Sequence, residues 1–479
     1  MRSELDCLFL HPVRRERQSG SLELTHLIMP VGLLAIAAFL EDHGFNTRVV
    51  HTGLEQMLDE RFEPSKTAKR FRPEVVAIDL HWCSHAYDAV ELARACKESL
   101  GCAVVLGGFT ASFFDAEILK RFPFIDAVVR GEGELPMLRF MESLDEGLDL
   151  TAVPNLSYRR GEAIVRNPLS YVADEEAVSQ LDFTRLSLLE HWEDYIRLMS
   201  LKSRLDEPNF LRRGWLSVGR GCSFNCSYCG GGLEAQRIIS GRTQPVFRRK
   251  EKVVEDIVKL QERSVRELYV DFDPYPEDRR YYRELFEMLR REKVDIGCEL
   301  LTWGLPDDEF IADFAGTFDP YFSMITISPE TGSEPVRRLN RGCPYSNEAL
   351  TRQVEALQKS GVYAQLFFSV GLTGETPRDF TSTIKLAEQL KGRFQNIIGP
   401  WCYGVAIEPA APRFLNPKAH GLTLYRKRFM DFYRFEAARA AGKTVAHPYG
   451  YRTEHMDEET IERFEKQFAA TVNVSKLEP

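Results

Sequence analysis

Residues 220–232 read Arg220-Gly-Cys222-Ser-Phe-Asn-Cys226-Ser-Tyr-Cys229-Gly-Gly-Gly232, so that three cysteines follow one another at offsets of four and three residues. Thiolates are the usual ligands of iron–sulfur clusters, and a [4Fe–4S] cube needs one ligand for each iron. Three ligands would leave one iron open to bind another molecule. The same offsets also fit one buried face of a helix, but the surrounding glycines favour a loop. We therefore predict a cluster held by Cys222, Cys226 and Cys229.

The composition is that of an ordinary globular protein. The chain has 479 residues, a length that predicts about three domains. Of these residues 44% are hydrophobic and 28% are charged, as in ordinary soluble proteins. A net charge of −9 gives no sign of nucleic-acid binding, and no apolar run approaches the ~20 residues of a membrane span. The first residues lack a signal-peptide pattern. Without such a signal, the ten cysteines favour metal or core roles over disulfides, and we expect a reducing cytoplasm.

Residues 1–150 alternate strand-like and helix-like stretches. Five short strands are predicted at Cys7–His11, Thr47–His51, Val75–Leu80, Ala103–Leu106 and Asp126–Val129. Helical patterns separate them, and this alternation is typical of a doubly wound, Rossmann-like parallel sheet in an α/β fold. Ligands of such sheets bind at the carboxyl ends of the strands. We therefore predict a ligand-binding domain over residues 1–150.

Two glycine-containing loops stand where that ligand-binding edge is predicted. One reads Leu106-Gly-Gly-Phe-Thr-Ala-Ser and the other reads Val129-Arg-Gly-Glu-Gly-Glu. Glycines let a ligand approach the backbone closely, although tight turns alone would use the same residues. The loops are therefore compatible with a nucleotide-like or cobalamin-like ligand and with a purely structural role.

Residues 211–419 show the alternation of strands and helices again. Six strands are predicted at Trp215–Val218, Glu267–Asp271, Ile296–Leu301, Phe322–Ile327, Ala364–Val370 and Ile397–Ile407. Six βα units form a partial (β/α)6 barrel with its chemistry at the carboxyl ends of the strands. The cysteine loop follows the first of these strands. Residues 151–210 read as a connector, and residues 420–479 as a helical C-terminal cap.

The cysteine loop resembles that of the radical S-adenosylmethionine (radical SAM) superfamily. That superfamily carries Cys-x3-Cys-x2-Cys with an aromatic residue before the last cysteine, here Tyr228. The resemblance implies that the amino and carboxylate groups of SAM bind the open iron of the [4Fe–4S] cluster. It also implies that an electron from the cluster breaks a carbon–sulfur bond of SAM and gives a 5′-deoxyadenosyl radical.

Later segments match further radical SAM patterns. Asp273 follows the second barrel strand, where relatives hold the SAM amino group, although it could equally cap a loop. Glu330 lies in a segment similar to one that meets the SAM ribose, and a carboxylate there can accept both hydroxyls. Arg341 could pair with the SAM carboxylate or lie on a solvated helix face. The SAM-binding residues that the resemblance implies are Tyr228, Gly230, Asp273, Glu330, Arg341 and Gly371.

The first domain resembles the cobalamin-binding domain that precedes many radical SAM domains. Those domains carry Pro-x-Gly-Leu-Leu in the first helix, matched by Pro30-Val-Gly-Leu-Leu34, and both glycine loops. The Asp-x-His-x-x-Gly motif, by which other cobalamin proteins supply a histidine ligand, is missing. His81 could ligate cobalt, since neutral imidazole is a common metal ligand, or hydrogen-bond a carbonyl or the cofactor tail. The cobalamin-binding residues that the resemblance implies are Asp79, His81, Trp82, Gly107, Gly108, Thr110, Gly131, Glu132 and Gly133.

The resemblance implies an enzyme with three cofactors, which are a [4Fe–4S] cluster, S-adenosyl-L-methionine and cobalamin. The leading hypothesis is methyl transfer from methylcobalamin to an unactivated carbon of a small-molecule or peptide substrate, after the adenosyl radical abstracts a hydrogen. The alternatives are rearrangement, cyclisation or C–C coupling with the same cofactors, and a non-catalytic corrinoid and iron–sulfur protein. An external electron donor of the flavodoxin or ferredoxin type is implied. No individual catalytic residue is predicted.

Overall fold

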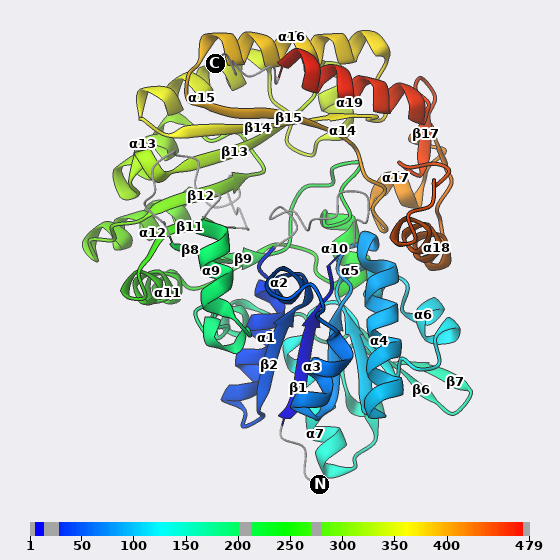
Figure 1. Ribbon diagram of the computed structural model, residues 1–479. Coiled ribbons are helices and arrows are strands. Elements are labelled where there is room, and N and C mark those ends of the chain that lie inside the picture. The colour runs from blue at the N-terminus through cyan, green and yellow to red at the C-terminus, as the bar shows by residue number, and fades with distance from the viewer. Residues whose placement is uncertain (1–4, 14–27, 201–211, 271–278, 473–479) are drawn as a thin grey trace. The chain divides into compact units, whose positions relative to one another are not determined.

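The computed structural model describes residues 5–13, 28–200, 212–270 and 279–472 (Figure 1). The chain divides into two compact units. The first unit comprises residues 1–210, 236–243 and 426–446, and the second comprises residues 211–235, 244–425 and 447–479. Each unit is therefore built from three separate stretches of the sequence.

The first unit contains a seven-stranded sheet in the order β2-β1-β3-β4-β5-β6-β7. Its strands are β1 (Leu5–His11), β2 (Thr47–His51), β3 (Pro73–Asp79), β4 (Ala103–Gly107), β5 (Ala127–Val129), β6 (Leu156–Arg160) and β7 (Ala163–Arg166). Strands β1 to β5 run parallel and lie at the five predicted positions. The sheet has two strands more than predicted, because the β6–β7 hairpin pairs antiparallel with β5 and covers the edge of the sheet.

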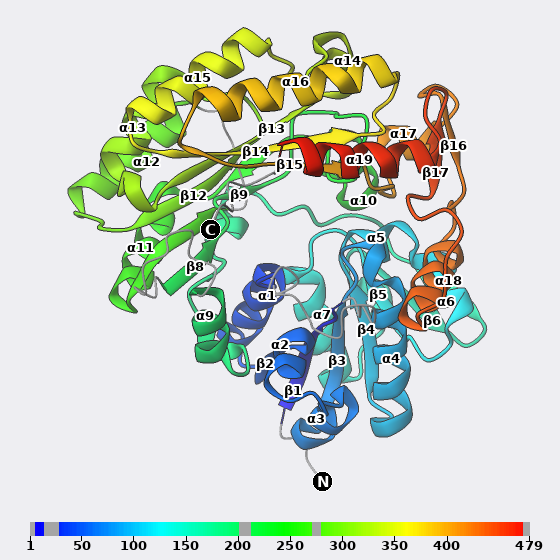
Figure 2. The same ribbon diagram turned by 45° about the horizontal axis from the view of Figure 1, so that its top comes forward.

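Helices cover both faces of this sheet. They are α1 (Val31–Asp42), α2 (Thr52–Leu58), α3 (Pro64–Phe71), α4 (Ala86–Leu100), α5 (Phe109–Phe113), α6 (Asp115–Arg121), α7 (Glu134–Glu146), α8 (Glu175–Ser179) and α9 (Trp192–Ser200). Helices α1 and α7 pack together on one face and α3 and α4 pack together on the other (Figure 2). This arrangement follows from right-handed crossovers that leave β1 in opposite directions, and it places a topological switch point between β1 and β3.

The first unit also includes residues predicted to lie elsewhere. Residues 151–210 belong to this unit rather than standing apart as a connector. Helix α18 (Phe429–Ala440), from the predicted C-terminal cap, packs on α4. The Glu117 carboxylate accepts hydrogen bonds from the Phe429 and Met430 amides at 3.0 and 3.3 Å and so caps α18. The rings of Phe429 and Phe432 lie 5.9 and 6.1 Å from that of Phe114.

The second unit contains a six-stranded parallel sheet in the order β15-β14-β13-β12-β11-β8. Its strands are β8 (Arg212–Leu216), β11 (Val265–Val270), β12 (Gly297–Thr302), β13 (Met324–Glu330), β14 (Tyr363–Val370) and β15 (Ile397–Gly404). Each pairs with its neighbour in the sequence, as expected for an open barrel of βα units. Two short antiparallel pairs accompany the sheet, β9 (Gly219–Arg220) with β10 (Val246–Phe247) and β16 (Leu422–Leu424) with β17 (Tyr451–Thr453).

Helices line the outer side of the barrel strands (Figure 1). They are α11 (Lys250–Glu262), α12 (Arg279–Arg291), α13 (Asp308–Thr317), α15 (Asn347–Lys359) and α16 (Pro377–Arg393). The shorter α14 (Glu334–Asn340) and α17 (Pro412–Leu415) lie in loops, and α10 (Leu233–Ser240) follows the cysteine loop and runs into the first unit. On strand β14, Ala364, Leu366, Phe368 and Val370 are buried and alternate with more accessible residues. This alternation places one face of β14 under the outer helices.

The C-terminal helix α19 (Glu458–Val472) supplies the outer helix that follows the last strand. It packs on α16 and β15. The Phe464 ring stacks on Phe380 at 4.7 Å, and the Phe468 ring lies 5.7 Å from Phe368 on β14. The predicted cap is therefore divided, with α18 in the first unit and α19 on the outside of the barrel in the second.

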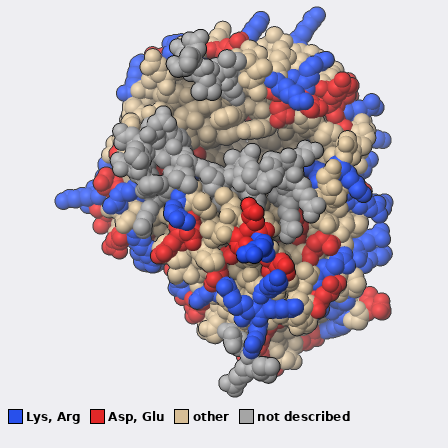
Figure 3. Space-filling view, in the orientation of Figure 1, with Lys and Arg blue, Asp and Glu red and all other residues tan. Residues whose placement is uncertain are grey.

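The charged surface is mixed. On the face shown in Figure 3, basic and acidic side chains alternate rather than gather by sign. Among the residues that the structure describes, no helix has the length and apolar character needed to cross a bilayer.

Candidate functional site

The three cysteines lie in a loop that follows the first barrel strand, as the sequence predicts. Each sulfur accepts a hydrogen bond from a backbone amide. The donors are Phe224 N to Cys222 Sγ at 3.3 Å, Gly231 N to Cys229 Sγ at 3.4 Å, and Gly342 N to Cys226 Sγ at 3.3 Å. Amide donors to sulfur stabilise the negative charge of cluster ligands and tune their iron. This donor set fits a cluster held by three thiolates.

No group of three or more His, Cys, Asp or Glu side chains within the described residues is close enough to hold a single metal ion. In the predicted cluster each cysteine would bind a different iron.

Asn340 at the end of α14 fastens the cysteine loop to the barrel. Its backbone carbonyl accepts from Ser227 N at 2.8 Å, and its Oδ1 accepts from the Ser227 hydroxyl at 2.6 Å. The same Oδ1 accepts from Thr373 N at 3.1 Å, while Nδ2 donates to Thr373 O and Val336 O, both at 2.9 Å. One buried amide thus joins the loop to the turn after β14. Sequence reasoning did not identify Asn340.

Three of the predicted SAM-binding residues meet in one hydrogen-bonded network. Glu330 Oε1 accepts from the Tyr228 hydroxyl at 2.7 Å and from Arg341 Nη1 at 3.0 Å, and Oε2 accepts from the Ser369 hydroxyl at 2.5 Å. Burial raises the pKa of Tyr228, and the adjacent Glu330 carboxylate raises it further. Tyr228 is therefore a neutral donor. Ser369 belongs to this network but to none of the predicted motifs.

Glu330 has a backbone φ of +66°. This left-handed conformation costs a non-glycine residue about 1–2 kcal/mol, and such strain concentrates at functional sites. The strain turns the last residue of β13 so that its carboxylate meets Tyr228 and Arg341. The barrel places these residues together, although more than a hundred positions separate Tyr228 from the other two.

The Arg341 guanidinium is buried but incompletely hydrogen-bonded. Its Nη groups donate to Ser328 O, to Glu330 and to Trp303 O, with the first contact at 2.6 Å. The Nε donor is buried and has no partner among the described residues. An orphaned buried donor of this kind fits an anionic ligand group. The solvated helix face that the sequence left open for Arg341 is excluded, since the residue is only 8% exposed.

Tyr228 also borders a small apolar cluster. Val336, Leu372 and Val405 form this cluster, and the Tyr228 ring packs against it. Leu372 follows β14 and Val405 follows β15, so the cluster lies after the fifth and sixth barrel strands.

The protein itself accounts for the two SAM-site glycines. Gly230 N donates to Glu408 Oε2 at 2.7 Å, and a Cβ at this residue would lie 2.8 Å from Pro409 O. Gly371 has φ +87°, and a Cβ there would lie 2.3 Å from the Tyr451 hydroxyl. The structure therefore explains both glycines by internal packing. Asp273 lies outside the described residues.

At the carboxyl edge of the first unit's sheet, β1 and β3 end in residues that bind each other. His11 Nδ1 and Asp79 Oδ2 are 3.0 Å apart across the switch point. Burial alone would raise the pKa of Asp79, but the hydrogen bond from His11 and the nearby His81 and His85 lower it overall. Two residues beyond Asp79, His81 stacks on Phe109. The edge is therefore rich in imidazole groups, of which the sequence identified only His81.

The glycine loop after β4 shows both an open backbone and a packed one. A Cβ on Gly107 would meet nothing closer than Val129 O at 3.9 Å, which leaves room for a ligand. Gly108 has φ +99°, and a Cβ there would lie 2.8 Å from His81 N. Thr110 donates its hydroxyl to His81 O at 2.8 Å and therefore orders the loop. Trp82 leaves 45% of its surface exposed.

The second glycine loop is occupied by protein contacts. The Glu132 carboxylate accepts from Ala173 N at 2.9 Å and from Arg242 Nε at 2.8 Å. A Cβ on Gly131 would lie 2.8 Å from Ser240 Cα, and one on Gly133 would lie 2.8 Å from Ile36 Cδ1. These contacts join residues 236–243 and α1 to the sheet. They explain the motif structurally, and Glu132 forms a buried ion pair.

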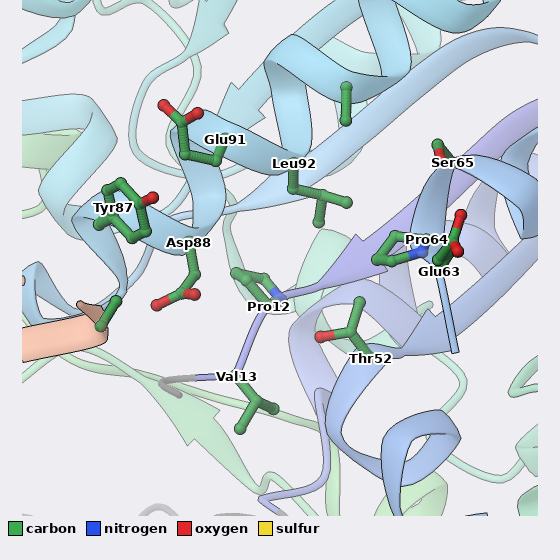
Figure 4. Close-up of a pocket in the computed structure, with 12 residues that line it drawn as sticks. Pro12, Val13, Thr52, Glu63, Pro64, Ser65, Tyr87, Asp88, Glu91 and Leu92 are labelled. Atoms are coloured by element: carbon green, nitrogen blue, oxygen red, sulfur yellow. The ribbon is translucent and has the colours of Figure 1, made fainter. Parts of the chain in front are cut away.

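A cavity of about 260 Å³ lies beside α3 and α4 in the first unit. Figure 4 shows Glu63, Asp88 and Glu91 at its wall, with Thr52 and Pro12 from the ends of β2 and β1. None of the nine predicted cobalamin-binding residues lines this cavity. The cavity therefore borders the carboxyl ends of β1 and β2 without including any residue of the predicted cobalamin set.

Two family models match the chain. The model of the Radical SAM superfamily matches residues 216–387, and that of the B12 binding domain matches residues 22–140. The first match contains the cysteine loop and the Glu330 network, and the second contains Asp79 and His81 of the sheet edge but not His11.

Two individual relatives match most of the chain at low sequence identity. An uncharacterized methyltransferase of Pyrococcus horikoshii is 26% identical over 376 residues, which span 75% of this chain and 73% of the relative. The anaerobic magnesium-protoporphyrin IX monomethyl ester cyclase of Rubrivivax gelatinosus is 25% identical over 418 residues, or 82% and 68% of the two chains.

A solved structure shares the fold. It is that of the radical S-adenosylmethionine methyltransferase TsrM from Kitasatospora setae, with cobalamin and a [4Fe-4S] cluster bound. The TM-score is 0.66 and the identity 16%, with 88% of this chain and 81% of that chain covered. The two family matches confirm the resemblance seen in the motifs. The chain is a radical SAM superfamily protein with a B12-binding domain.

Proposed function

We propose that this chain is a cobalamin-dependent radical SAM enzyme that transfers a methyl group, by way of its cobalamin, to an unactivated carbon of a small-molecule or peptide substrate. The three-cysteine loop with one amide donor for each sulfur carries the proposal. Two matched relatives with methyltransferase names support it. When bound, the cluster and SAM would supply a 5′-deoxyadenosyl radical and the corrinoid would supply the methyl group.

In this proposal Cys222, Cys226 and Cys229 hold the cluster, and the backbone fixes their positions. The tether through Asn340 matters because the cysteines must keep their spacing while the cluster changes charge. A site built on rigid elements holds its geometry better than one on a free loop. The loop gains this rigidity from α14 and the turn after β14.

Arg341 and Glu330 would bind two different parts of SAM. The unpartnered Nε of Arg341 would donate to the SAM carboxylate. Glu330 Oε1 already accepts two hydrogen bonds and is full, whereas Oε2 accepts only that of Ser369. A carboxylate oxygen accepts about two hydrogen bonds. Glu330 therefore has room for one ribose hydroxyl at Oε2 rather than for both.

The apolar cluster and the sheet edge would bind the remaining groups. Val336, Leu372 and Val405, with Tyr228, would pack against adenine. At the sheet edge, the open backbone at Gly107 and the exposed Trp82 ring would lie against the corrinoid. The predicted roles of Gly108, Thr110 and the second glycine loop become indirect, because these residues shape the edge through protein contacts.

The test is anaerobic reconstitution with iron, sulfide and cobalamin, followed by incubation with SAM and a strong reductant. Both S-adenosylhomocysteine and 5′-deoxyadenosine are expected, with a methylated product when the substrate is present. Cys226→Ala should abolish SAM cleavage while cobalamin stays bound to the B12-binding domain. Cys102→Ala, a half-buried cysteine outside the loop, should cleave SAM like the wild type. Retained cleavage in Cys226→Ala would overturn the assignment.

The second candidate function is cyclisation or another rearrangement without methyl transfer. The match to the Rubrivivax gelatinosus cyclase favours it specifically. The same incubation separates the two candidates, since this chemistry gives 5′-deoxyadenosine without S-adenosylhomocysteine. If neither product forms in protein that holds cluster and cobalamin, the chain is a non-catalytic binding protein.

The proposed setting is a reducing cytoplasm with an external electron donor of the flavodoxin or ferredoxin type. The need for a donor follows from the chemistry, because each cleavage of SAM consumes one electron. Replacing the chemical reductant with a reduced flavodoxin or ferredoxin and measuring 5′-deoxyadenosine tests this part of the proposal.

A further inference from the structure

The carboxyl edge of the sheet in the first unit has its topological switch point between β1 and β3. In open parallel sheets, ligands bind in the crevice outside the carboxyl ends of the strands at this point. The first polar groups there are His11, Asp79 and His81. His11 and Asp79 bind each other at 3.0 Å. His81, two residues after Asp79, takes no part in this hydrogen-bonded pair.

The His81 ring is packed on its face and open in its plane. Its centroid lies 4.6 Å from that of Phe109, with an angle of 25° between the rings, and Trp82 meets it edge-on at 4.5 Å. Both ring nitrogens lie in the ring plane, so stacking leaves their lone pairs and protons free. No hydrogen bond within the described residues joins either nitrogen to a partner, whereas the His81 carbonyl is bonded.

The backbone of His81 is held in place by the loop after β4. Its carbonyl accepts from Thr110 N at 3.2 Å and from the Thr110 hydroxyl at 2.8 Å. Ala111 N donates to Leu80 O at 3.1 Å, and Gly108 fits against His81 N only because it lacks a Cβ. A rigid backbone that presents a free imidazole is the arrangement that a metal ligand needs.

A neutral imidazole nitrogen is a common metal ligand. Two other histidines near this edge use their ring nitrogens within the protein. His11 bonds Asp79, and His51 bonds Leu54 N and Ile28 O.

We propose that the imidazole of His81 coordinates the cobalt of the bound corrinoid as an axial ligand. The inference deepens the proposed function and rests on its cobalamin. The nitrogen lone pair forms the bond, and the cofactor's own benzimidazole base or a water leaves that position. No electron is transferred in this exchange. The loop after β3 would thus supply the ligand that the Asp-x-His-x-x-Gly motif supplies in other cobalamin proteins.

The test is the electron paramagnetic resonance spectrum of the cob(II)alamin form, loaded with unlabelled cobalamin into ¹⁵N-labelled protein. The axial nitrogen splits each cobalt line, and its isotope reveals its origin. A doublet comes from ¹⁵N of the protein and is the expected result. A triplet comes from the ¹⁴N of the cofactor's own base and would overturn the proposal, as would lines without nitrogen splitting.

Variants assign the doublet. His81→Ala should lose it completely while cobalamin remains bound, and His11→Asn, at the same edge, should keep it. A doublet that survives in His81→Ala, or vanishes only in His11→Asn, refutes the assignment to His81. If His81→Ala binds no cobalamin, wild-type protein with ¹⁵N only in its histidines shows whether the axial nitrogen comes from a histidine. The spectrum of His11→Asn then shows whether that histidine is His11. Wild-type protein that binds no cobalamin would instead refute the proposed function.

Discussion

Replacing Asn340 with alanine should loosen the cysteine loop. Asn340 is 1% exposed. Its side chain accepts from the Ser227 hydroxyl and Thr373 N and donates to the carbonyls of Val336 and Thr373. Alanine removes all four hydrogen bonds and leaves space that no neighbouring polar group fills.

The cost follows from the two donors that lose their acceptor. The Ser227 hydroxyl and the Thr373 amide are both buried, and Asn340 Oδ1 is the acceptor given for each in the described residues. An unsatisfied buried donor costs about 1–3 kcal/mol, so the two together cost about 2–6 kcal/mol. A domain is stable by about 5–15 kcal/mol. The loop should therefore open often enough to measure, while the rest of the barrel stays folded.

Hydrogen exchange of the metal-free protein, followed by mass spectrometry, measures this opening. Even the lower bound of about 2 kcal/mol corresponds to about 30-fold faster exchange, expected in peptides that cover residues 222–233 and 370–376. After reconstitution, the variant should hold less iron than the wild type. Asn416→Ala, at an exposed asparagine of the same unit, should change neither measurement.

A milder variant, Ser227→Ala, distinguishes local opening of the loop from unfolding of the whole unit. Ser227→Ala removes one hydroxyl and leaves the bond between Asn340 and Thr373 N, so it should cost about 0.5–1.5 kcal/mol and speed exchange in the loop only modestly. Wild-type exchange and full iron content in Asn340→Ala would refute the reasoning. Equal effects of the two variants would refute it as well.

Two further predictions concern buried carboxyl groups. Burial raises the pKa of Glu375 from 4.5 to about 8. The unfolded chain therefore loses this proton first, and the contribution of Glu375 to stability, complete below about pH 4.5, falls by about 1.4 kcal/mol per pH unit as pH rises towards 8. Guanidinium unfolding of the second unit, measured at about pH 6 and at about pH 8, gives the change in unfolding free energy between the two. Glu375→Gln should make that change smaller, and an equal change in the variant and the wild type would contradict the prediction. Glu132→Ala should destabilise the first unit by about 3–5 kcal/mol, since it leaves the charge of the buried Arg242 guanidinium uncompensated. Replacing Glu132 with leucine and Arg242 with methionine in one double variant should restore the unfolding midpoint. A Glu132→Ala variant that stays stable but loses cobalamin affinity would instead indicate that Glu132 contacts the ligand directly.

Much of the fold could be predicted because its signals are local. Strand and helix patterns alternate within short windows, and each of the eleven strands predicted for the two parallel sheets overlaps a strand of the structure. The pairing of the β6–β7 hairpin with β5 is a long-range contact that no local pattern encodes. The same holds for α18, whose place depends on Glu117 and on aromatic rings more than three hundred residues earlier.

The motif glycines occur where the resemblance implies them, but the contacts that require a glycine there come from residues outside the motifs. Gly131 and Gly133 occur in the predicted place, yet the contacts that need them come from Ser240 and Ile36. Gly371 similarly makes room for the Tyr451 hydroxyl. A sequence reveals that a position needs glycine but not which neighbour demands it. Gly107 differs, because the nearest atom to a Cβ there, Val129 O, would lie 3.9 Å away.

The same limit applies to the polar groups that could do chemistry. Motifs identified Tyr228, Glu330 and Arg341, and parallel strands bring them together because their carboxyl ends share one edge. Whether a carboxylate can accept from a ligand depends on which of its lone pairs the protein already uses. Ser369 occupies one position on Glu330, and Tyr228 and Arg341 occupy two others. At the sheet edge, likewise, Asp79 hydrogen-bonds His11. Ser369 and His11, which occupy hydrogen-bonding positions on the predicted carboxylates, therefore lie outside the motifs that locate the two sites.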